Sequence, residues 1–185
     1  EATAGDGDDL APRIEQALAK ALTTNIAADI VIAQSGQQAK QFWELRETLP
    51  EVQKPEGGSI KHDIAVPVSA IPAFLTAAEQ LVSDLCPGIR IVAFGHMGDG
   101  NIHYNLTQPE GADKAAYLAR WDEIQTAVHD LVVSFGGSIS AEHGIGQMKV
   151  AHLKRYKDPV TLATMHAIKQ ALDPRHILNP GKVLG

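Results

Sequence analysis

Cysteine is nearly absent from this sequence, which has only Cys86 among its 185 residues. A single cysteine excludes an internal disulfide and is consistent with a reducing compartment, so we expect a cytoplasmic protein. Long apolar runs are also missing, since no stretch approaches the roughly 18 consecutive apolar residues of a transmembrane helix. The first residues do not have the pattern of a signal peptide.

Basic segments are missing as well. The formal net charge is −6 and no run of lysine or arginine occurs, which argues against nucleic acid as a partner. The sequence has no internal repeat at a short period and no linker that divides it. An apolar content of 44% over this length is enough for one core, so a single domain is expected. Residues 1–9 are small and polar and lack a methionine, which predicts a piece of a longer protein that begins in a loop.

The spacing of apolar residues predicts a mixture of helices and strands. The expected helices cover residues 10–22, 37–53, 67–85, 112–135, 147–155 and 159–172. The expected strands cover residues 26–33, 59–66 and 138–141, together with a hairpin over 89–107. Pro50 is expected to bend the second helix or end it early. The order of these elements predicts an α+β fold with helices packed on an antiparallel sheet, and its two β-α-β halves suggest a ferredoxin-like arrangement.

The hairpin carries the first candidate chemical site. An Asp99-Gly100 turn is a strong hairpin signal, and it would pair His96 directly with His103. Directly opposed residues have Cβ atoms roughly 5 Å apart, so both imidazoles could reach one divalent cation. Asn105 lies on the same face as His103. The alternative is that the two histidines are unrelated polar residues, and a third ligand would decide between these interpretations.

Glu142 is the natural third ligand. Two histidines and one carboxylate form a catalytic metal set that leaves positions open for a substrate. Adjacent residues on an extended strand point to opposite faces, so Glu142 and His143 could share a site only through a turn. Gly144 and Gly146 make such a turn possible. His143 would then be free for acid–base work, because histidine titrates near neutral pH. The alternative is a solvated pair at the end of a strand.

Two cationic residues are candidates for binding a carboxylate. Arg46 lies on the apolar side of its expected helix, and arginine suits bidentate recognition of carboxylates. Lys61 lies on the expected strand 59–66. The alternatives are an ion pair within the helix for Arg46, for example with Glu51, and a pair with Asp63 for Lys61.

Several motifs, in order, resemble the C-terminal domain of FAD-linked oxidases. The three strongest are GHMGDGNIH at 95–103, AEHGIG at 141–146 with Lys149, and LNPGK at 178–182. Two earlier segments, FWELRE at 42–47 and KHDIAVP at 61–67, are also similar to motifs of this family. The resemblance runs from about residue 37 to the end, and the first 35 residues match only in layout. The family comprises D-lactate, D-2-hydroxyglutarate and glycolate dehydrogenase-like flavoenzymes of the vanillyl-alcohol oxidase superfamily.

The resemblance implies a substrate- and metal-binding cap domain that covers the flavin of an N-terminal FAD domain. His96, His103 and Glu142 would hold a divalent metal, which the family suggests is zinc. His143 would be the base that removes the proton of the 2-hydroxyl group while hydride leaves C2 for the flavin.

The resemblance also implies a pocket for a small 2-hydroxy acid. Arg46 and Lys61 would bind the carboxylate of this substrate, and Asn105 would contact its hydroxyl or carboxylate. Some members of the family have a hydroxyl residue one turn after the arginine, where this sequence has Pro50. The identity of the 2-hydroxy acid is therefore left open, and so is a homodimer.

Two other functions remain as alternatives. The same His, His and Glu set could activate water in a metal-dependent hydrolase that uses no flavin. A non-catalytic member of the fold, retained for binding or assembly, is the other alternative. For the flavoenzyme, we expect the isolated chain to bind metal without binding FAD tightly or turning over, because no GxGxxG motif follows an expected strand.

Overall fold

The computed structural model describes residue 5 and residues 9–185 and divides the chain into two units, 1–49 and 50–185. Most of the polar opening stretch lies outside the described residues. The first unit contains α1 (Ala11–Thr23) and the greater part of α2 (Gly36–Val52). Helix α2 continues through Pro50 to Val52, so the expected early end at Pro50 was wrong.

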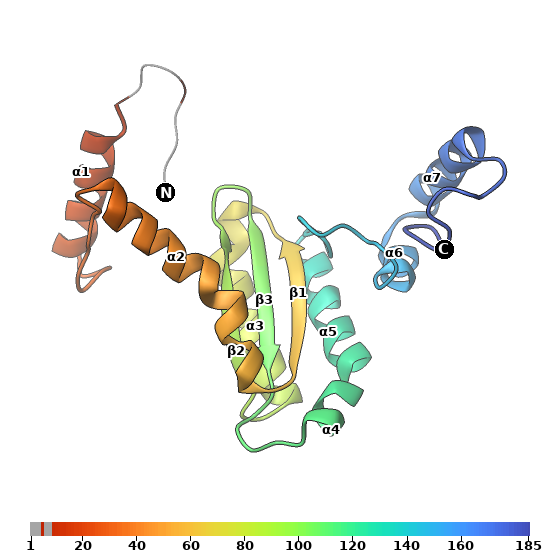
Figure 1. Ribbon diagram of the computed structural model, residues 1–185, viewed down its shortest axis with the longest axis horizontal. Helices are drawn as coiled ribbons and strands as arrows, with labels where there is room; N and C mark the ends of the chain where they lie inside the picture. Colours follow the sequence, from red (N-terminus) through yellow and green to blue (C-terminus); the bar gives the residue numbers. More distant parts are fainter. Residues whose placement is uncertain (1–4, 6–8) are drawn as a thin grey trace. The chain divides into compact units, whose positions relative to one another are not determined.

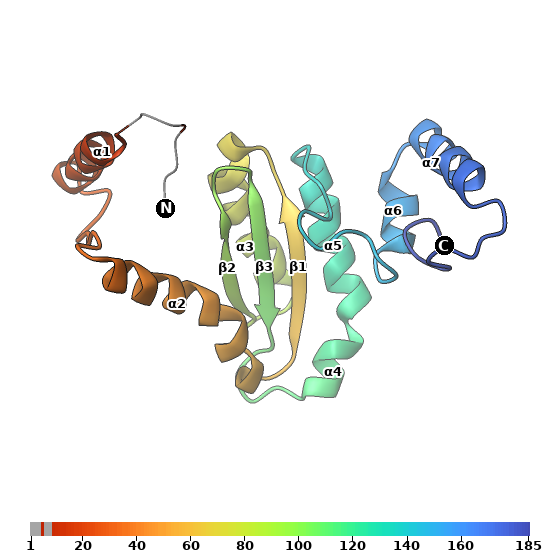
Figure 2. The same cartoon turned by 45° about the horizontal axis from the view of Figure 1, so that its top comes forward.

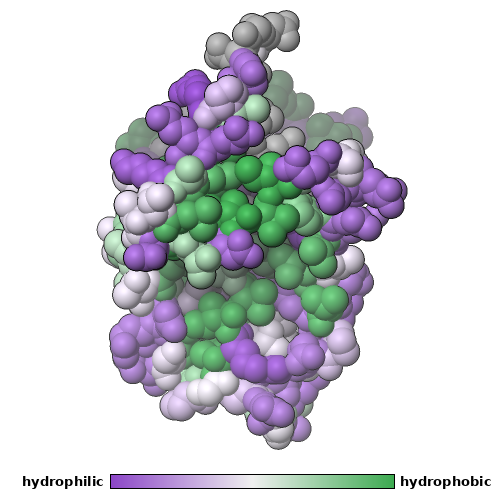
Figure 3. Space-filling view, turned by 90° about the vertical axis from the view of Figure 1, so that its left-hand side faces the viewer, coloured by the Kyte–Doolittle hydropathy of each residue, from purple (hydrophilic) through white to green (hydrophobic). Residues whose placement is uncertain are grey.

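The strand expected at 26–33 does not form. The chain turns at the end of α1, where the N–H groups of Ile26 and Ala27 both donate to Ala21 O, and Asn25 is left-handed with φ +55°. No strand occurs among the described residues of the first unit, so this segment has no partner for a ladder of backbone hydrogen bonds. Viewed from the α1 side, apolar side chains gather on the surface of the molecule (Figure 3).

The second unit is built on a three-stranded antiparallel sheet (Figure 1). Its strands are β1 (Ser59–Ala65), β2 (Arg90–His96) and β3 (Asn101–Thr107), in the order β1-β3-β2. Its other elements are η1 (Lys54–Glu56), η2 (Val68–Ala70), α3 (Ile71–Leu85), α4 (Lys114–Ala119), α5 (Trp121–Ser134), α6 (Val150–Tyr156) and α7 (Pro159–Leu172). The expected α+β class is confirmed.

One face of the sheet forms the core. Helices α3 and α5 pack against it (Figure 2), and alternate residues of the strands enter this core because side chains alternate along a strand. The buried apolar side chains from the sheet and the two helices are Ile60, Ile64, Ile102, Tyr104, Leu106, Ile71, Phe74, Ala78, Val82, Ile124, Val128 and Val132. The opposite face of the sheet is therefore left for the polar residues of the candidate site.

The fourth strand of the expected ferredoxin-like order is a single bridge. Ser138 and Ala65 exchange both backbone hydrogen bonds, at 3.0 and 2.8 Å, on the edge of β1 away from β3. Beyond this bridge, Ser140 O accepts a hydrogen bond from Ser138 Oγ at 2.7 Å, a local bond that competes with pairing between backbones. The ladder therefore stops at Ser138. The expected strand 138–141 is thus reduced to one residue, while the β-α-β-β-α-β order is kept.

The long helix expected at 112–135 is two helices. Asp113 caps α4 by accepting a hydrogen bond from Ala116 N at 2.7 Å. Helix α4 ends at Arg120, whose guanidinium donates to Leu85 O at 3.0 Å and pairs with Glu123. A tertiary contact therefore sets the break, and such a contact leaves no signal in apolar spacing.

The hairpin has a longer turn than predicted. Its loop is Met97–Gly100, so His96 pairs with Asn101, and Phe94 rather than His96 lies opposite His103. The turn is closed by Gly100 N donating to His96 O at 3.1 Å. The shift is two residues, which preserves the face of each side chain because the period of a strand is two. His96 and His103 therefore still share the face opposite the core.

Candidate metal and substrate site

Four polar residues lie in two adjacent rows on the face of the sheet opposite the core. Lys61 of β1 lies directly opposite Asn105 of β3, and Asp63 lies directly opposite His103. Because residues two apart on a strand share a face, the two rows are neighbours. Candidate substrate and metal residues thus occupy one polar surface.

The segment that follows the Ser138 bridge bends over this surface. Residues 141–143 form a bend, and Gly144 and Gly146 both have left-handed φ values, +72° and +54°. The turn that Glu142 and His143 needed in order to face one site is therefore present. Glycine adopts these φ values without the steric cost that a Cβ atom would bring.

Glu142 lies between the two predicted histidine ligands. Its Oε1 is 3.2 Å from His96 Nε2, and its Oε2 is 3.4 Å from His103 Nε2. The three side chains come from β2, β3 and the 141–143 bend. Two imidazole nitrogens and one carboxylate are a donor set that suits a borderline-soft divalent cation such as zinc. Among the described residues, however, the three potential ligand atoms that all lie within 4.8 Å of one another belong to a different group. The role of His96, His103 and Glu142 as ligands remains a prediction.

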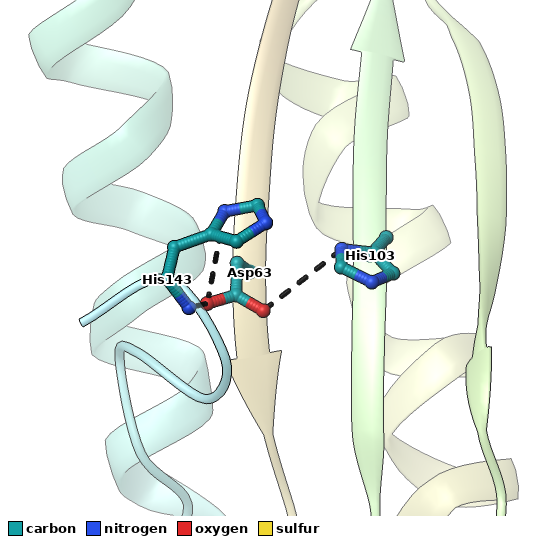
Figure 4. Close-up of side chains that lie close together, drawn as sticks. All are labelled: Asp63, His103 and His143. Carbon is teal, nitrogen blue, oxygen red and sulfur yellow. Dashed lines mark hydrogen bonds and ion pairs between the residues drawn. The ribbon is translucent and has the colours of Figure 1, made fainter. Parts of the chain in front are cut away.

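A second group of potential ligands overlaps the first. One ligand atom from each of Asp63, His103 and His143 lies within 4.8 Å of the others (Figure 4). Asp63 Oδ1 is 3.9 Å from His103 Nδ1, and Asp63 Oδ2 is 3.9 Å from His143 Nδ1. His103 belongs to both groups, presenting Nε2 to Glu142 and Nδ1 to Asp63.

Asp63 holds the bend in place. Its carboxylate accepts hydrogen bonds from three consecutive backbone N–H groups, those of Ala141 (3.1 Å), Glu142 (3.3 Å) and His143 (2.8 Å). Burial by itself would raise the pKa of Asp63, but these N–H donors, led by that of His143, together with the nearby His143 ring, lower the pKa below its ordinary value. Asp63 is therefore a charged, buried anchor.

The sequence did not identify Asp63 as part of the site. It was considered only as an ion-pair partner for Lys61, yet no carboxylate in the described part of the chain forms an ion pair with Lys61. Asp63 could have been found from the alternation of side chains along the expected strand 59–66, which puts Asp63 on the polar face next to Lys61. Its hydrogen bonds span 78–80 residues of sequence, which local spacing cannot reveal.

Lys149 and Phe94 also support the site and were not assigned a role from the sequence. The ammonium of Lys149 donates to Ile139 O at 2.9 Å, Ser140 Oγ at 3.2 Å and Asp63 O at 3.3 Å. Burial lowers its pKa, against the opposite effect of the Asp63 carboxylate. The ring of Phe94 lies 5.1 Å from that of His103, and the His143 ring lies 5.6 Å from it.

Asn105 is buried and its amide donates to Gln53 Oε1 at 3.0 Å, another contact that the sequence did not suggest. Lys61 is exposed. Arg46 lies on α2, within unit 1–49. The substrate-binding roles of Lys61, Asn105 and Arg46 remain predictions.

Comparison with known proteins agrees with the motifs. The family model described as "FAD linked oxidases, C-terminal domain" matches residues 2–183, so the similarity extends through the first 35 residues as well. None of the helices in the described part of the chain is both long and apolar enough to cross a bilayer.

Three relatives illustrate the match. A D-2-hydroxyglutarate dehydrogenase of Xanthomonas citri pv. viticola is 41% identical over 84% of this chain and 33% of its own length. One of Stutzerimonas stutzeri is 38% identical over 92% of this chain and 37% of its own length. A D-lactate dehydrogenase of Anaerostipes hadrus is 33% identical over 92% and 35%. The chain thus spans about a third of the length of these relatives.

Proposed function

Because this chain belongs to the family of FAD-linked oxidase C-terminal domains, we propose that it is the substrate- and metal-binding part of a FAD-dependent 2-hydroxyacid dehydrogenase. The reaction would convert a D-2-hydroxy acid into the 2-oxo acid. The observation that carries this proposal is the position of the Glu142 carboxylate between His96 Nε2 and His103 Nε2, next to the row of Lys61 and Asn105.

The donor set fits a divalent cation. His96, His103 and Glu142 would hold it, and three protein ligands leave a position open for the substrate. When bound, the cation would polarise the 2-hydroxyl oxygen and FAD would accept the hydride from C2. We take zinc as the cation to be tested first, because two imidazoles and a carboxylate suit it.

His143 would accept the proton of the 2-hydroxyl group. Its side chain is 66% exposed, while its backbone N–H is fixed by Asp63 at 2.8 Å. The ring is therefore available to a bound substrate from an anchored backbone. It also lies beside His103, so the proton acceptor and a metal ligand would face the same substrate atom.

Lys61 would bind the substrate carboxylate, with Asn105 beside it. For Arg46, which belongs to unit 1–49, a carboxylate-binding role is proposed separately, from its residue type alone. The ammonium of Lys61 is exposed and lies one row from the candidate metal ligands, so a carboxylate at Lys61 would bring the adjacent hydroxyl toward them. The names of the relatives favour D-2-hydroxyglutarate as the substrate, with D-lactate as the next candidate. A cytoplasmic location and pairing with an N-terminal FAD domain are part of the same proposal.

Zinc titration of this chain tests the ligand set. We expect the unsubstituted chain to bind one zinc, and His96→Ala and Glu142→Gln to weaken binding by about 100-fold or more, because each removes a ligand. His143→Ala and the control His166→Ala, on exposed α7, should keep the affinity within about threefold. If His143→Ala abolished binding while His96→Ala preserved it, the ligands would instead be Asp63, His103 and His143.

Turnover tests the role of His143. In the full-length flavoenzyme that contains this chain, His143→Ala should lower kcat by about 100-fold or more, since this is what loss of a general base typically costs. Zinc content should stay at the level of the unsubstituted enzyme. Loss of zinc together with kcat would mean that the roles of Glu142 and His143 are exchanged.

A further inference from the structure

Asp63 lies next to both the proposed metal ligands and the proposed proton acceptor, and the proposed function gives it no role. It lies on β1, is only 3% exposed, and bonds to the backbone of residues 141–143. This bend carries Glu142, a proposed metal ligand, and His143, the proposed base. The position of both side chains therefore depends on one carboxylate that comes from a different part of the sequence.

Asp63 also faces the metal ligand on the neighbouring strand. His103 Nδ1 is 3.9 Å from Asp63 Oδ1, and His103 Nε2 is 3.4 Å from Glu142 Oε2. At 3.9 Å the attraction is electrostatic rather than a direct hydrogen bond. With a cation bound at Nε2, the ring proton of His103 would lie on Nδ1, next to the Asp63 carboxylate. Such carboxylate–histidine pairs orient metal ligands and raise their basicity.

We propose that Asp63 is a positioning residue, which holds Glu142 and His143 through the 141–143 backbone and faces the Nδ1–H of His103 when Nε2 binds the metal. This inference rests on the proposed function, because it takes His96, His103 and Glu142 as the metal ligands. It assigns Asp63 no direct contact with the metal or with the substrate.

The lone pairs of the carboxylate support positioning over ligation. An ionised carboxylate has about four acceptor sites. Asp63 Oδ2 uses two of them for the N–H groups of Ala141 and His143, and Oδ1 uses one for that of Glu142. The remaining site is on Oδ1, the oxygen that faces His103 Nδ1. A cation at this last site would take the place of the ring N–H of His103, so Asp63 can either bind a cation there or face the Nδ1–H of His103.

Asp63→Asn is the variant that tests this proposal, with Asp173→Asn as a matched control. Asp173 is also buried, at 4% exposure, and its carboxylate likewise accepts backbone N–H groups, from Ile177 and Leu178, both at 3.0 Å. It anchors the 176–178 segment rather than the 141–143 bend. Asp173 additionally pairs with Lys169 Nζ at 2.5 Å, so its loss should cost at least as much stability as that of Asp63. Both variants remove a buried carboxylate that holds backbone N–H groups, one at the site and one outside it.

Zinc titration of this chain and ¹⁵N NMR of its histidine rings provide the readouts. Asp63→Asn should weaken zinc binding by about 10- to 100-fold, the usual effect of losing a partner of a metal ligand, and should shift the Nδ1–H resonance of His103 in the zinc-bound chain. Asp173→Asn should change zinc affinity by less than about threefold and leave that resonance unchanged. The absorption spectrum of bound Co²⁺ should keep its shape in Asp63→Asn, because the ligands are the same.

Three results would overturn the proposal. One is unchanged zinc affinity and an unchanged His103 Nδ1–H resonance in Asp63→Asn. Another is equal weakening by Asp173→Asn, which would indicate general destabilisation. The third is an altered Co²⁺ spectrum, which would make Asp63 a ligand. If Asp63→Asn does not fold, Asp63→Glu shifts the carboxylate by one methylene, and unchanged affinity in that variant overturns the proposal as well. Failure of the unsubstituted chain to bind zinc would instead refute the proposed function.

Discussion

At the scale of single residues, most of the site prediction depended on the alternation of side chains between the two faces of a strand. His96 and His103 share a face although the observed pairing differs from the predicted one by two residues. A shift by an even number of residues keeps each side chain on its face. The bend that Glu142 needed was readable from Gly144 and Gly146. Asp63 was not identified, because its partners are backbone N–H groups, which are the same in every sequence.

The hairpin turn provides a test at one glycine. Gly100 has φ +78°, and a Cβ atom there would lie 1.9 Å from Val66 O. We expect Gly100→Ala to lower the free energy of unfolding by about 2 kcal/mol or more, through left-handed strain and the backbone clash. Gly98→Ala in the same turn meets nothing within 4 Å and should change it by less than about 0.5 kcal/mol. Urea unfolding of both variants measures the difference, and equal stabilities would contradict the turn geometry.

Two buried histidines should make the fold sensitive to acid. The pKa of His62 is lowered to about 4, mainly by burial, partly offset by its bond to Tyr104 O, with Lys149 and His152 adding to the lowering. The pKa of His129 is lowered to about 3, by burial and then by His62, His152 and Lys149. Below about pH 6.5 the unfolded chain binds protons that the folded chain does not, so stability is full above that pH and falls as the pH drops.

This linkage predicts a loss of roughly 2–4 kcal/mol in unfolding free energy between pH 7 and pH 5. Urea unfolding with EDTA present measures it, so that metal binding does not contribute. His129→Gln should reduce the pH dependence by about half, because one of the two groups is removed. His166→Gln, at an exposed position, should leave the dependence unchanged. A pH-independent stability over this range would show that neither histidine is buried in its neutral form.

At the scale of elements, local patterns predicted which segments are regular but not where tertiary contacts cut them. The segment 26–33 has the composition of a strand yet has no neighbouring strand in its unit. Helices α4 and α5 separate where Arg120 reaches Leu85 O. Strand 138–141 shrinks to the Ser138 bridge because Ser138 Oγ bonds within its own segment. Each error arises from a partner that apolar spacing does not encode.

The contribution of the hydrogen bond between α4 and β3 to stability can be measured by substituting two buried tyrosines. Tyr117 OH of α4 donates to Leu106 O of β3 at 2.7 Å, whereas the buried Tyr104 OH has no hydrogen-bond partner among the described residues. Tyr117→Phe should cost about 1–2 kcal/mol of unfolding free energy, because it leaves the buried Leu106 carbonyl without this donor. Tyr104→Phe should be neutral or slightly stabilising. The reverse order in a urea titration would contradict the assigned bond.

At the scale of the whole molecule, family membership covers almost the entire chain, while the chain covers about a third of its relatives. Sequence motifs predicted the family and the α+β class well, because both depend on many residues at once. The substrate and the electron acceptor depend on a few contacts, so the motifs left both of them open.

One prediction follows for the cofactors of the isolated chain. We expect these 185 residues to bind zinc but not to retain FAD, because no GxGxxG motif follows a strand in them. Flavin absorbance after gel filtration with excess FAD measures this, and metal analysis of the same sample provides the control for a folded chain. Tight FAD binding with turnover by this chain alone would refute the assignment of flavin binding to another domain.

The tie between Asp63 and the 141–143 bend also has a consequence for how the chain folds. It joins segments 79 residues apart in a protein that has a single cysteine and no covalent cross-link of its own. Closing a loop of this length is entropically costly. A cation shared by Glu142 and the hairpin histidines would close a second loop within it, from His103 to Glu142, and would stabilise the folded chain much as a disulfide does. Metal loading would then act as a reversible staple, raising the melting temperature in proportion to the logarithm of free zinc.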